Sequence, residues 1–386
     1  MTAPDDRALQ NVTIDAIVAE AVRVARDGPQ RGEVYRGLRC GVNGLAFAVA
    51  GIASARRSRE LEQTVDALHD RLERVYDSLS YPDDELIYAS SFAHSDASYW
   101  LIRADWAVHR GDSAALARAF ESFEHAQAMR GAGRDFVMGV PGWLAGAVHM
   151  AQLLRLGDAA DPPRAACADL AGRLFADVVA DLPAAASDAP ELDDTFAHGW
   201  GGALFACLEY GRFFGVPPPA RVAAHVERLA ATAEERVPPL LHISPECTYP
   251  GSWCNGSAGQ TFFWLSAHRV FGTEALLDLA RYAAHHSGQT WKGIGPSMCC
   301  GLTGQSYALF AVEAATGDGI WEKRAVELAN LGAQRVRPIR GMYDRALFVG
   351  MAGPAVLFAQ LQSEERPHMP LLDSFTAPRA RPAPAP

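Results

Sequence analysis

The chain has 386 residues, of which 49% are hydrophobic and 21% charged, a composition typical of folded globular proteins. Its formal net charge of -10 disfavours nucleic-acid binding, which normally requires a basic surface. No apolar run approaches the ~20 residues that span a bilayer, and no signal peptide follows Met1, so we expect a cytoplasmic protein. Its seven cysteines are too few for a disulfide scaffold, which leaves reduced thiols that a metal can bind.

A signature of two small residues spaced three apart, Gly-x-x-Gly, recurs seven times along the chain. Successive copies begin 44 to 60 residues apart, which indicates one repeated supersecondary unit. The second copy has serine in place of both glycines. The copies are Gly41 to Gly44, Ser95 to Ser98, Gly139 to Gly142, Gly199 to Gly202, Gly256 to Gly259, Gly301 to Gly304 and Gly350 to Gly353.

An amphipathic segment precedes each signature, with apolar residues three and four apart and charges between them. This pattern predicts helices buried on one side only, which would form an outer layer. We expect these outer helices at 12–25, 60–79, 114–129, 164–179, 221–235, 274–286 and 320–334.

The segment after each signature is apolar on nearly all faces and predicts a buried inner helix. In the second to sixth repeats a glycine follows the end of the signature after 13 to 15 residues, about four helical turns. A left-handed cap at the end of each inner helix would favour glycine. The expected caps are Gly111, Gly157, Gly215, Gly272 and Gly317.

Seven inner and seven outer helices predict an all-α fold, an α/α toroid of seven helical hairpins. The same hairpins can build an open superhelix, but small residues at the start of every inner helix indicate convergence on an axis and favour the ring. We expect a single toroid domain at 1–363. Residues 364–386 are rich in proline and are expected to form a C-terminal tail.

The two residues before each signature are expected on loops at one end of the ring, facing its centre. Four of the seven cysteines and two of the twelve histidines fall in these fourteen positions, more than chance would place there. Thiols and imidazoles gathered in this way suit zinc, and three protein ligands would leave a fourth position open. The six residues are Cys40, His94, His198, Cys254, Cys299 and Cys300.

Two of these loops resemble the zinc motifs of the lanthionine synthetase C-like family. Residues 253–256, Trp-Cys-Asn-Gly, resemble the first motif, and residues 299–301, Cys-Cys-Gly, resemble the second. The second motif more commonly carries histidine after its cysteine. The resemblance therefore implies a three-cysteine zinc site with Cys254, Cys299 and Cys300 as ligands.

Two further segments resemble motifs of the same family. Phe-Ala-His-Gly at 196–199 resembles its histidine motif, and Asp135 stands four residues before a glycine signature, as the catalytic aspartate of the family does. The resemblance extends over roughly residues 12 to 361. From the chemistry implied, we assign His198 as the general acid and Asp135 as the group that orients or charge-stabilises it, with Trp253 and Asn255 at the pocket.

The implied reaction is Michael-type addition of a peptide cysteine to dehydroalanine or dehydrobutyrine in the same peptide, which forms a thioether ring. A free cysteine has a pKa of about 8.5, so zinc coordination would supply the thiolate at neutral pH. The expected partners are a dehydrated precursor peptide and a separate dehydratase, since no kinase, lyase or nucleotide-binding segment is found. The precursor's identity, its rings and the oligomeric state are not predicted.

Two other functions are consistent with the same residues. One is addition of glutathione or another small thiol to dehydrated protein residues, and the other is a non-catalytic peptide-binding scaffold with a structural zinc. Carbohydrate hydrolysis would require paired carboxylates, and the fourteen positions before the signatures contain none. Outside the motifs, we interpret Cys167, Cys207 and Cys247 as core residues and His94 as structural, and leave the role of Cys40 open.

Overall fold

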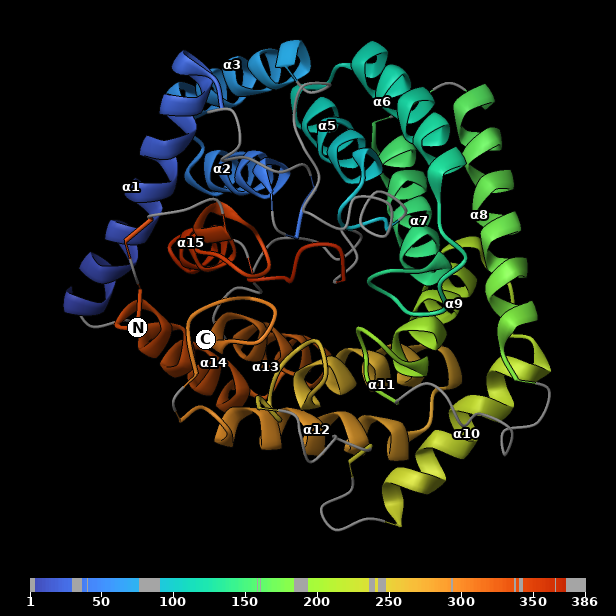
Figure 1. The fold of residues 1–386 in the computed structure, drawn as a ribbon. Coiled ribbons are helices and arrows are strands. Elements are labelled where there is room, and N and C mark those ends of the chain that lie inside the picture. The colour runs from blue at the N-terminus through green and yellow to red at the C-terminus, as the bar shows by residue number, and fades with distance from the viewer. Residues whose placement is uncertain are drawn as a thin grey trace, which may run out of the picture.

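The computed structural model describes residues 4–29, 37–39, 41–75, 91–157, 159, 161–183, 194–235, 240–241, 248–292, 294–336, 338–339, 343–364 and 366–372. These residues contain fourteen α-helices and no β-strand, arranged in two concentric layers around one axis (Figure 1). The prediction of an all-α fold with seven inner and seven outer helices is confirmed.

The two layers differ in burial. The inner helix α11 buries every residue from Ser257 to Ala267, whereas the outer helix α3 buries only one stripe. The inner helices are α2 (Val42–Arg56), α5 (Asp96–Arg110), α7 (Val140–Leu156), α9 (Trp200–Phe214), α11 (Ser257–Phe271), α13 (Leu302–Thr316) and α15 (Ala352–Leu361). The outer helices are α1 (Pro4–Asp27), α3 (Arg59–Val75), α6 (Ser113–Ala126), α8 (Asp161–Asp181), α10 (Ala220–Glu234), α12 (Glu274–Gln289) and α14 (Gly319–Ala333).

Most inner helices end as the glycine spacing predicts. Gly111, Gly215, Gly272 and Gly317 are left-handed caps with φ between 67° and 71°. The prediction is wrong at Gly157, which ends α7 with a φ of -82°, outside the left-handed region. The cap of α2 is also left-handed, but there the residue is Arg57, with φ 49°.

The second glycine of the signature is required by close packing between neighbouring repeats. A Cβ on Gly202 would collide with the carbonyl oxygen of Phe196 and with the Cβ of Phe136 in the preceding repeat. A Cβ on Gly259 would likewise collide with the carbonyl oxygen of Trp253 and with the Cβ of Phe196 in the preceding repeat. The second glycine of the signature therefore lets its inner helix begin directly against the loop of the preceding repeat.

The ring is closed, so the alternative of an open superhelix does not apply. The backbone N of Leu347 in the last repeat lies 3.4 Å from the carbonyl oxygen of Leu38 in the first. The last inner helix, α15, packs against α2 and α1 (Figure 1). A Cβ on Gly44 would collide with the backbone of Leu347, which repeats across the closure the contact seen between sequential repeats.

Residues 366–372 follow α15 and are packed against the core. Pro367, Met369, Pro370 and Leu372 are buried. Within the described part of the chain, no helix is both long and apolar enough to cross a lipid bilayer.

Candidate functional site

A belt of seven loops surrounds one end of the toroid axis. Each loop is a short turn directly before an inner helix, and hydrogen bonds join each loop to the next. In the second repeat, which lacks the glycines, the link is made by the Ser91 hydroxyl, which donates to the carbonyl of Val137 at 2.6 Å. The other links are donated by backbone N–H groups: Leu38 to Ala93, Val137 to Ala197, Ala197 to Cys254, Cys254 to Cys299, Cys299 to Phe348 and Leu347 to Leu38.

The belt brings the three motif cysteines together. The Sγ atom of Cys300 lies 3.3 Å from that of Cys254 and 3.5 Å from that of Cys299, and all three atoms lie within 4.8 Å of one another. Cys254 and Cys299 are buried, and Cys300 is partly exposed. A tetrahedral zinc with Zn–S bonds of about 2.3 Å holds sulfur pairs about 3.8 Å apart, so these positions fit that ion.

The electrostatics of the cluster also fit a cation. Hydrogen bonds from Cys299 and Cys300 lower the pKa of Cys254, so one thiolate is stabilised by its neighbours. The same thiolate, together with burial, raises the pKa of Cys299 and of Cys300. All three residues could be thiolates together only beside a bound cation, and a soft divalent metal suits three sulfur ligands.

His198 and Asp135 come from neighbouring loops and approach each other beside the cluster. The Nδ1 atom of His198 lies 3.6 Å from Oδ2 of Asp135, and the His198 side chain is 42% exposed. The other carboxylate oxygen of Asp135 accepts a hydrogen bond from the backbone N–H of Met138, which fixes the carboxylate in its turn. His198 is close enough to Cys254 for its charge to lower the pKa of that thiol.

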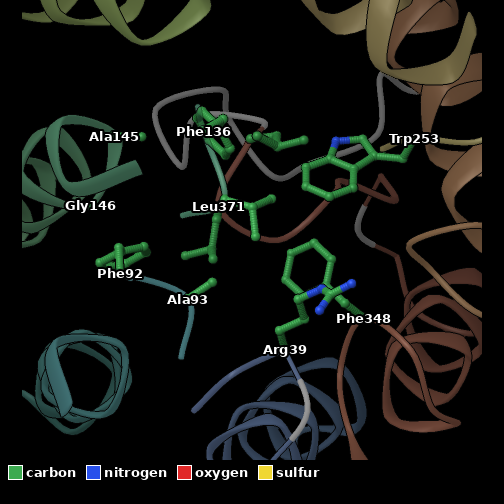
Figure 2. Close-up of a pocket in the computed structure, with 11 residues that line it drawn as sticks. Arg39, Phe92, Ala93, Phe136, Ala145, Gly146, Trp253, Phe348 and Leu371 are labelled. Carbon is green, nitrogen blue, oxygen red and sulfur yellow. The ribbon is translucent and has the colours of Figure 1, made fainter. Parts of the chain in front are cut away.

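A cavity lies at the centre of the belt, and Figure 2 shows the residues that line it. Its walls are mainly apolar and include the rings of Phe92, Phe136, Trp253 and Phe348. Trp253 directly precedes Cys254 and is 2% exposed. The rings of Trp253 and Phe348 are in contact, with centroids 5.1 Å apart.

Asn255 completes the turn that carries Cys254. Its backbone N–H donates to Ser252 Oγ at 3.3 Å. Its side-chain oxygen is buried without a hydrogen-bond partner in the described part of the chain, next to the thiol cluster. The sequence placed Trp253 and Asn255 at the pocket, and Trp253 is the one that lines this cavity.

Of the residues that line the cavity, only Trp253 has a role predicted from the sequence, and Arg39 and Leu371 are two of those that the sequence missed. Arg39 is the second residue before the first signature, and it lines the cavity. Its positive charge acts to lower the pKa of both Cys300 and His94, beside the larger effects of their other neighbours and of burial. Leu371 also lines the cavity, although composition assigned it to the tail. Arg39 could have been noticed because it is the only basic residue among the residues two positions before the seven signatures. Nothing in the repeat pattern points to Leu371.

Cys167, Cys207 and His94 have the structural positions that the sequence predicts for them. Cys167 and Cys207 are free and buried in the core. His94 is buried, and its Nδ1 atom lies 2.9 Å from Ser91 Oγ, the hydroxyl that links the second loop to the third. Cys40 and Cys247 lie outside the described residues.

The fold and the site define a class of protein: an α/α toroid with a cluster of three thiols and an adjacent histidine at one end of its axis. The model of the family described as lanthionine synthetase C-like protein matches residues 29–373. The chain belongs to this family.

Two known proteins are similar to this chain, one in structure and one in sequence. Nisin cyclase has a similar solved structure, with a TM-score of 0.67 and 14% sequence identity over 91% of this chain and 94% of that chain. At this identity the likeness establishes the fold. The LanC-like protein GCL1 of Arabidopsis thaliana is 30% identical over an alignment that covers 29% of this chain and only 27% of that protein.

Proposed function

We propose that the chain is a zinc-dependent cyclase that joins cysteine thiols to dehydroalanine or dehydrobutyrine residues of the same peptide. The observation that carries the proposal is the grouping of the Cys254, Cys299 and Cys300 thiols beside His198 at the loop belt. Family membership and the cyclase fold of the structural neighbour support it. The net charge of -10 is consistent with a peptide substrate and not with nucleic acid.

Cys254, Cys299 and Cys300 would hold the zinc ion, which leaves one coordination position for a substrate thiol. When bound, zinc lowers the pKa of a coordinated thiol, so that the peptide cysteine reacts as a thiolate at neutral pH. The belt hydrogen bonds hold the two cysteine loops together through their backbones. The ligand set is therefore preorganised by the fold and does not depend on side-chain packing alone.

In the addition, the substrate thiol loses its proton, its sulfur forms a bond to the β-carbon as the carbon–carbon double bond becomes single, and the α-carbon gains a proton, so the product has the same mass as the reactant. We assign the proton donated to the α-carbon to His198, whose partly exposed ring lies beside the thiol cluster. Asp135 orients this ring from 3.6 Å while its other oxygen is held by the turn. The apolar cavity lined by Trp253, the residue before Cys254, would limit water on that side of the cysteine loop.

The substrate implied by this chemistry is a dehydrated precursor peptide. Its dehydroalanine and dehydrobutyrine residues must be supplied by an enzyme that removes water from serine and threonine. A separate dehydratase is therefore the proposed partner reaction.

Incubation of the protein with a dehydrated peptide, with and without glutathione, tests the proposal. Cyclisation consumes one free thiol per ring without changing the mass, and alkylation of residual thiols before mass spectrometry counts them. Gain of glutathione mass would instead support addition of a small thiol, and zinc content without either reaction would support a scaffold. Both of those results contradict the proposed cyclase.

A further inference from the structure

The chain turns back after α15 and carries residues 366–372 to the centre of the toroid (Figures 1 and 2). Two contacts hold the start of this segment. Arg366 pairs with Glu313 near the end of α13, with Nε and Oε2 3.2 Å apart. The side chain of Gln360 bonds both backbone groups of His368, donating to the carbonyl at 3.3 Å and accepting from the N–H at 3.4 Å.

The end of the segment reaches the cavity of the loop belt. Figure 2 shows Leu371 within the cavity, among side chains contributed by several repeats. Leu372 and Met369 are buried and joined by a turn, in which the Leu372 N–H donates to the Met369 carbonyl at 3.3 Å. Leu371 is only partly buried, so its side chain offers surface to the cavity.

Leu371 has a backbone conformation that leucine seldom adopts. Its φ is 67°, in the left-handed region, and Arg57 is the only other residue besides glycine with a positive φ in the described part of the chain. Strained residues of this kind persist where the surrounding structure fixes them, often at ligand sites. Here the anchors at Arg366 and His368 and the burial of Leu372 fix the turn that places Leu371 in the cavity.

We infer that Leu371 forms the floor of the substrate cavity and limits the size of the peptide side chain accepted next to the reacting dehydro residue. The inference rests on the proposed function. It makes Leu371 a specificity-determining residue supplied by the C-terminal segment, and the ligand class it selects is a small apolar side chain of a peptide.

The position of the cavity relative to the thiols supports this assignment. Trp253 lines the cavity and is covalently followed by Cys254. Phe348 lines it too, and its carbonyl accepts the N–H of Cys299 at 2.8 Å. Two walls of the cavity are therefore tied through the backbone to the cysteine loops, and on the proposed function a side chain next to the reacting residue of the peptide would enter the cavity against these two rings and Leu371.

The other walls have little freedom to adapt. The loops that carry them are joined by the belt hydrogen bonds. Phe92 is packed so tightly on α7 that a Cβ at Gly146 would lie 2.5 Å from its ring. Leu371 belongs to none of these loops, so its side chain can vary in size without altering the belt.

The test uses two dehydrated peptides that differ only in the residue before dehydroalanine, alanine in one and phenylalanine in the other. In the full chain, we expect Leu371→Ala to raise kcat/KM for the phenylalanine peptide relative to the alanine peptide by about tenfold or more, since a pocket methylene alone discriminates on this scale. Leu371→Met should keep the wild-type ratio, because it preserves side-chain volume. Zinc content should stay unchanged in both variants.

Leu361→Ala is the matched control, because Leu361 is a partly buried leucine at the end of α15 that does not line the cavity. An unchanged ratio in Leu371→Ala, or an equal change in Leu361→Ala, would overturn the inference. Dissociation constants for the same two peptides with alanine in place of dehydroalanine provide a readout without catalysis. If no peptide is cyclised, the proposed function fails, and the shift or constancy of these dissociation constants still decides the role of Leu371.

Discussion

The Sγ atoms of Cys254 and Cys300 lie 3.3 Å apart, although 46 positions of sequence separate the two residues. Their loops are joined directly, since the N–H of Cys254 donates to the carbonyl of Cys299. The thiol cluster is therefore a product of the closed ring, in which each loop is hydrogen-bonded to the next. The predictions below follow from this arrangement.

Replacing the third thiol should separate metal binding from reactivity. Three thiolates leave a zinc site with a net negative charge, whereas histidine at position 300 would remove one unit of that charge. We expect Cys300→His to keep zinc but to cyclise a dehydrated peptide several-fold more slowly, because the substrate sulfur becomes less electron-rich. Zinc analysis and a cyclisation time course check this, and an unchanged rate and ring pattern would contradict it.

His198→Asn should abolish cyclisation while leaving zinc in place. Loss of a general acid typically slows a reaction by about 10²- to 10⁴-fold. Asp135→Asn should have a smaller effect, since the amide oxygen of the new side chain could still accept the Met138 N–H and His198 would keep its place. Single-turnover cyclisation and zinc content are the measurements. Loss of zinc from His198→Asn would place this histidine among the ligands instead.

The left-handed cap at Arg57 is a site where glycine should stabilise the fold. Four other inner helices have glycine at this position with nearly the same φ, whereas Arg57 adopts it with a side chain. Its ion pair with Glu364, at 3.4 Å, is exposed and contributes little. We expect Arg57→Gly to raise the free energy of unfolding by about 0.5–1 kcal/mol in urea titrations.

Gly215→Ala provides the reciprocal control. No atom lies within 4 Å of the Cβ it would introduce, so the change acts only through the backbone at φ 69°. The free energy of unfolding should fall by about 1 kcal/mol. Equal stabilities for Gly215→Ala and the wild type would show that these caps are not strained.

Stability should decline as the pH falls below about 6.5. Burial lowers the pKa of His69 well below its ordinary value, and lowers that of His94 to about 3. Because the unfolded chain binds protons at these histidines first, the stability contributed by the neutral rings is complete above the unfolded pKa and is lost as the pH falls toward the folded pKa.

His69→Phe should reduce this loss. His69 is fully buried, with neither ring nitrogen hydrogen-bonded within the described residues, so a phenyl ring removes the proton site at similar volume. Urea unfolding at pH 7.5 and pH 5.5 gives the comparison, with His125→Phe on the exposed face of α6 as the control. The same pH sensitivity in His69→Phe and the wild type would contradict the assignment.

Much of the fold could be predicted because it depends on local rules that repeat. A glycine is required where the loop of Trp253 meets the next inner helix at Gly304, and this requirement recurs in every repeat except the second, which has serine. The glycine spacing predicted the wrong conformation for Gly157 and no cap at Arg57, since a glycine outside the left-handed region and an arginine inside it both depend on tertiary context.

The site was predictable where its residues belong to the repeated loops. Position in the repeat predicted that Cys254, Cys299 and Cys300 would meet, and the structure places them within 4.8 Å of one another. Leu371 could not be placed from its sequence, because it reaches the cavity through one non-repeated turn after α15. The roles of His198 and Asp135 remain predictions that the variants above test.

The most direct measurement is the zinc content of the purified protein and of two matched variants. We predict one zinc per chain in the wild type and in Cys207→Ala, whose thiol is buried in α9 away from the cluster, and none in Cys254→Ala. A wild-type protein without zinc after purification in zinc-containing medium, or Cys254→Ala with full zinc content, would contradict the three-cysteine metal centre.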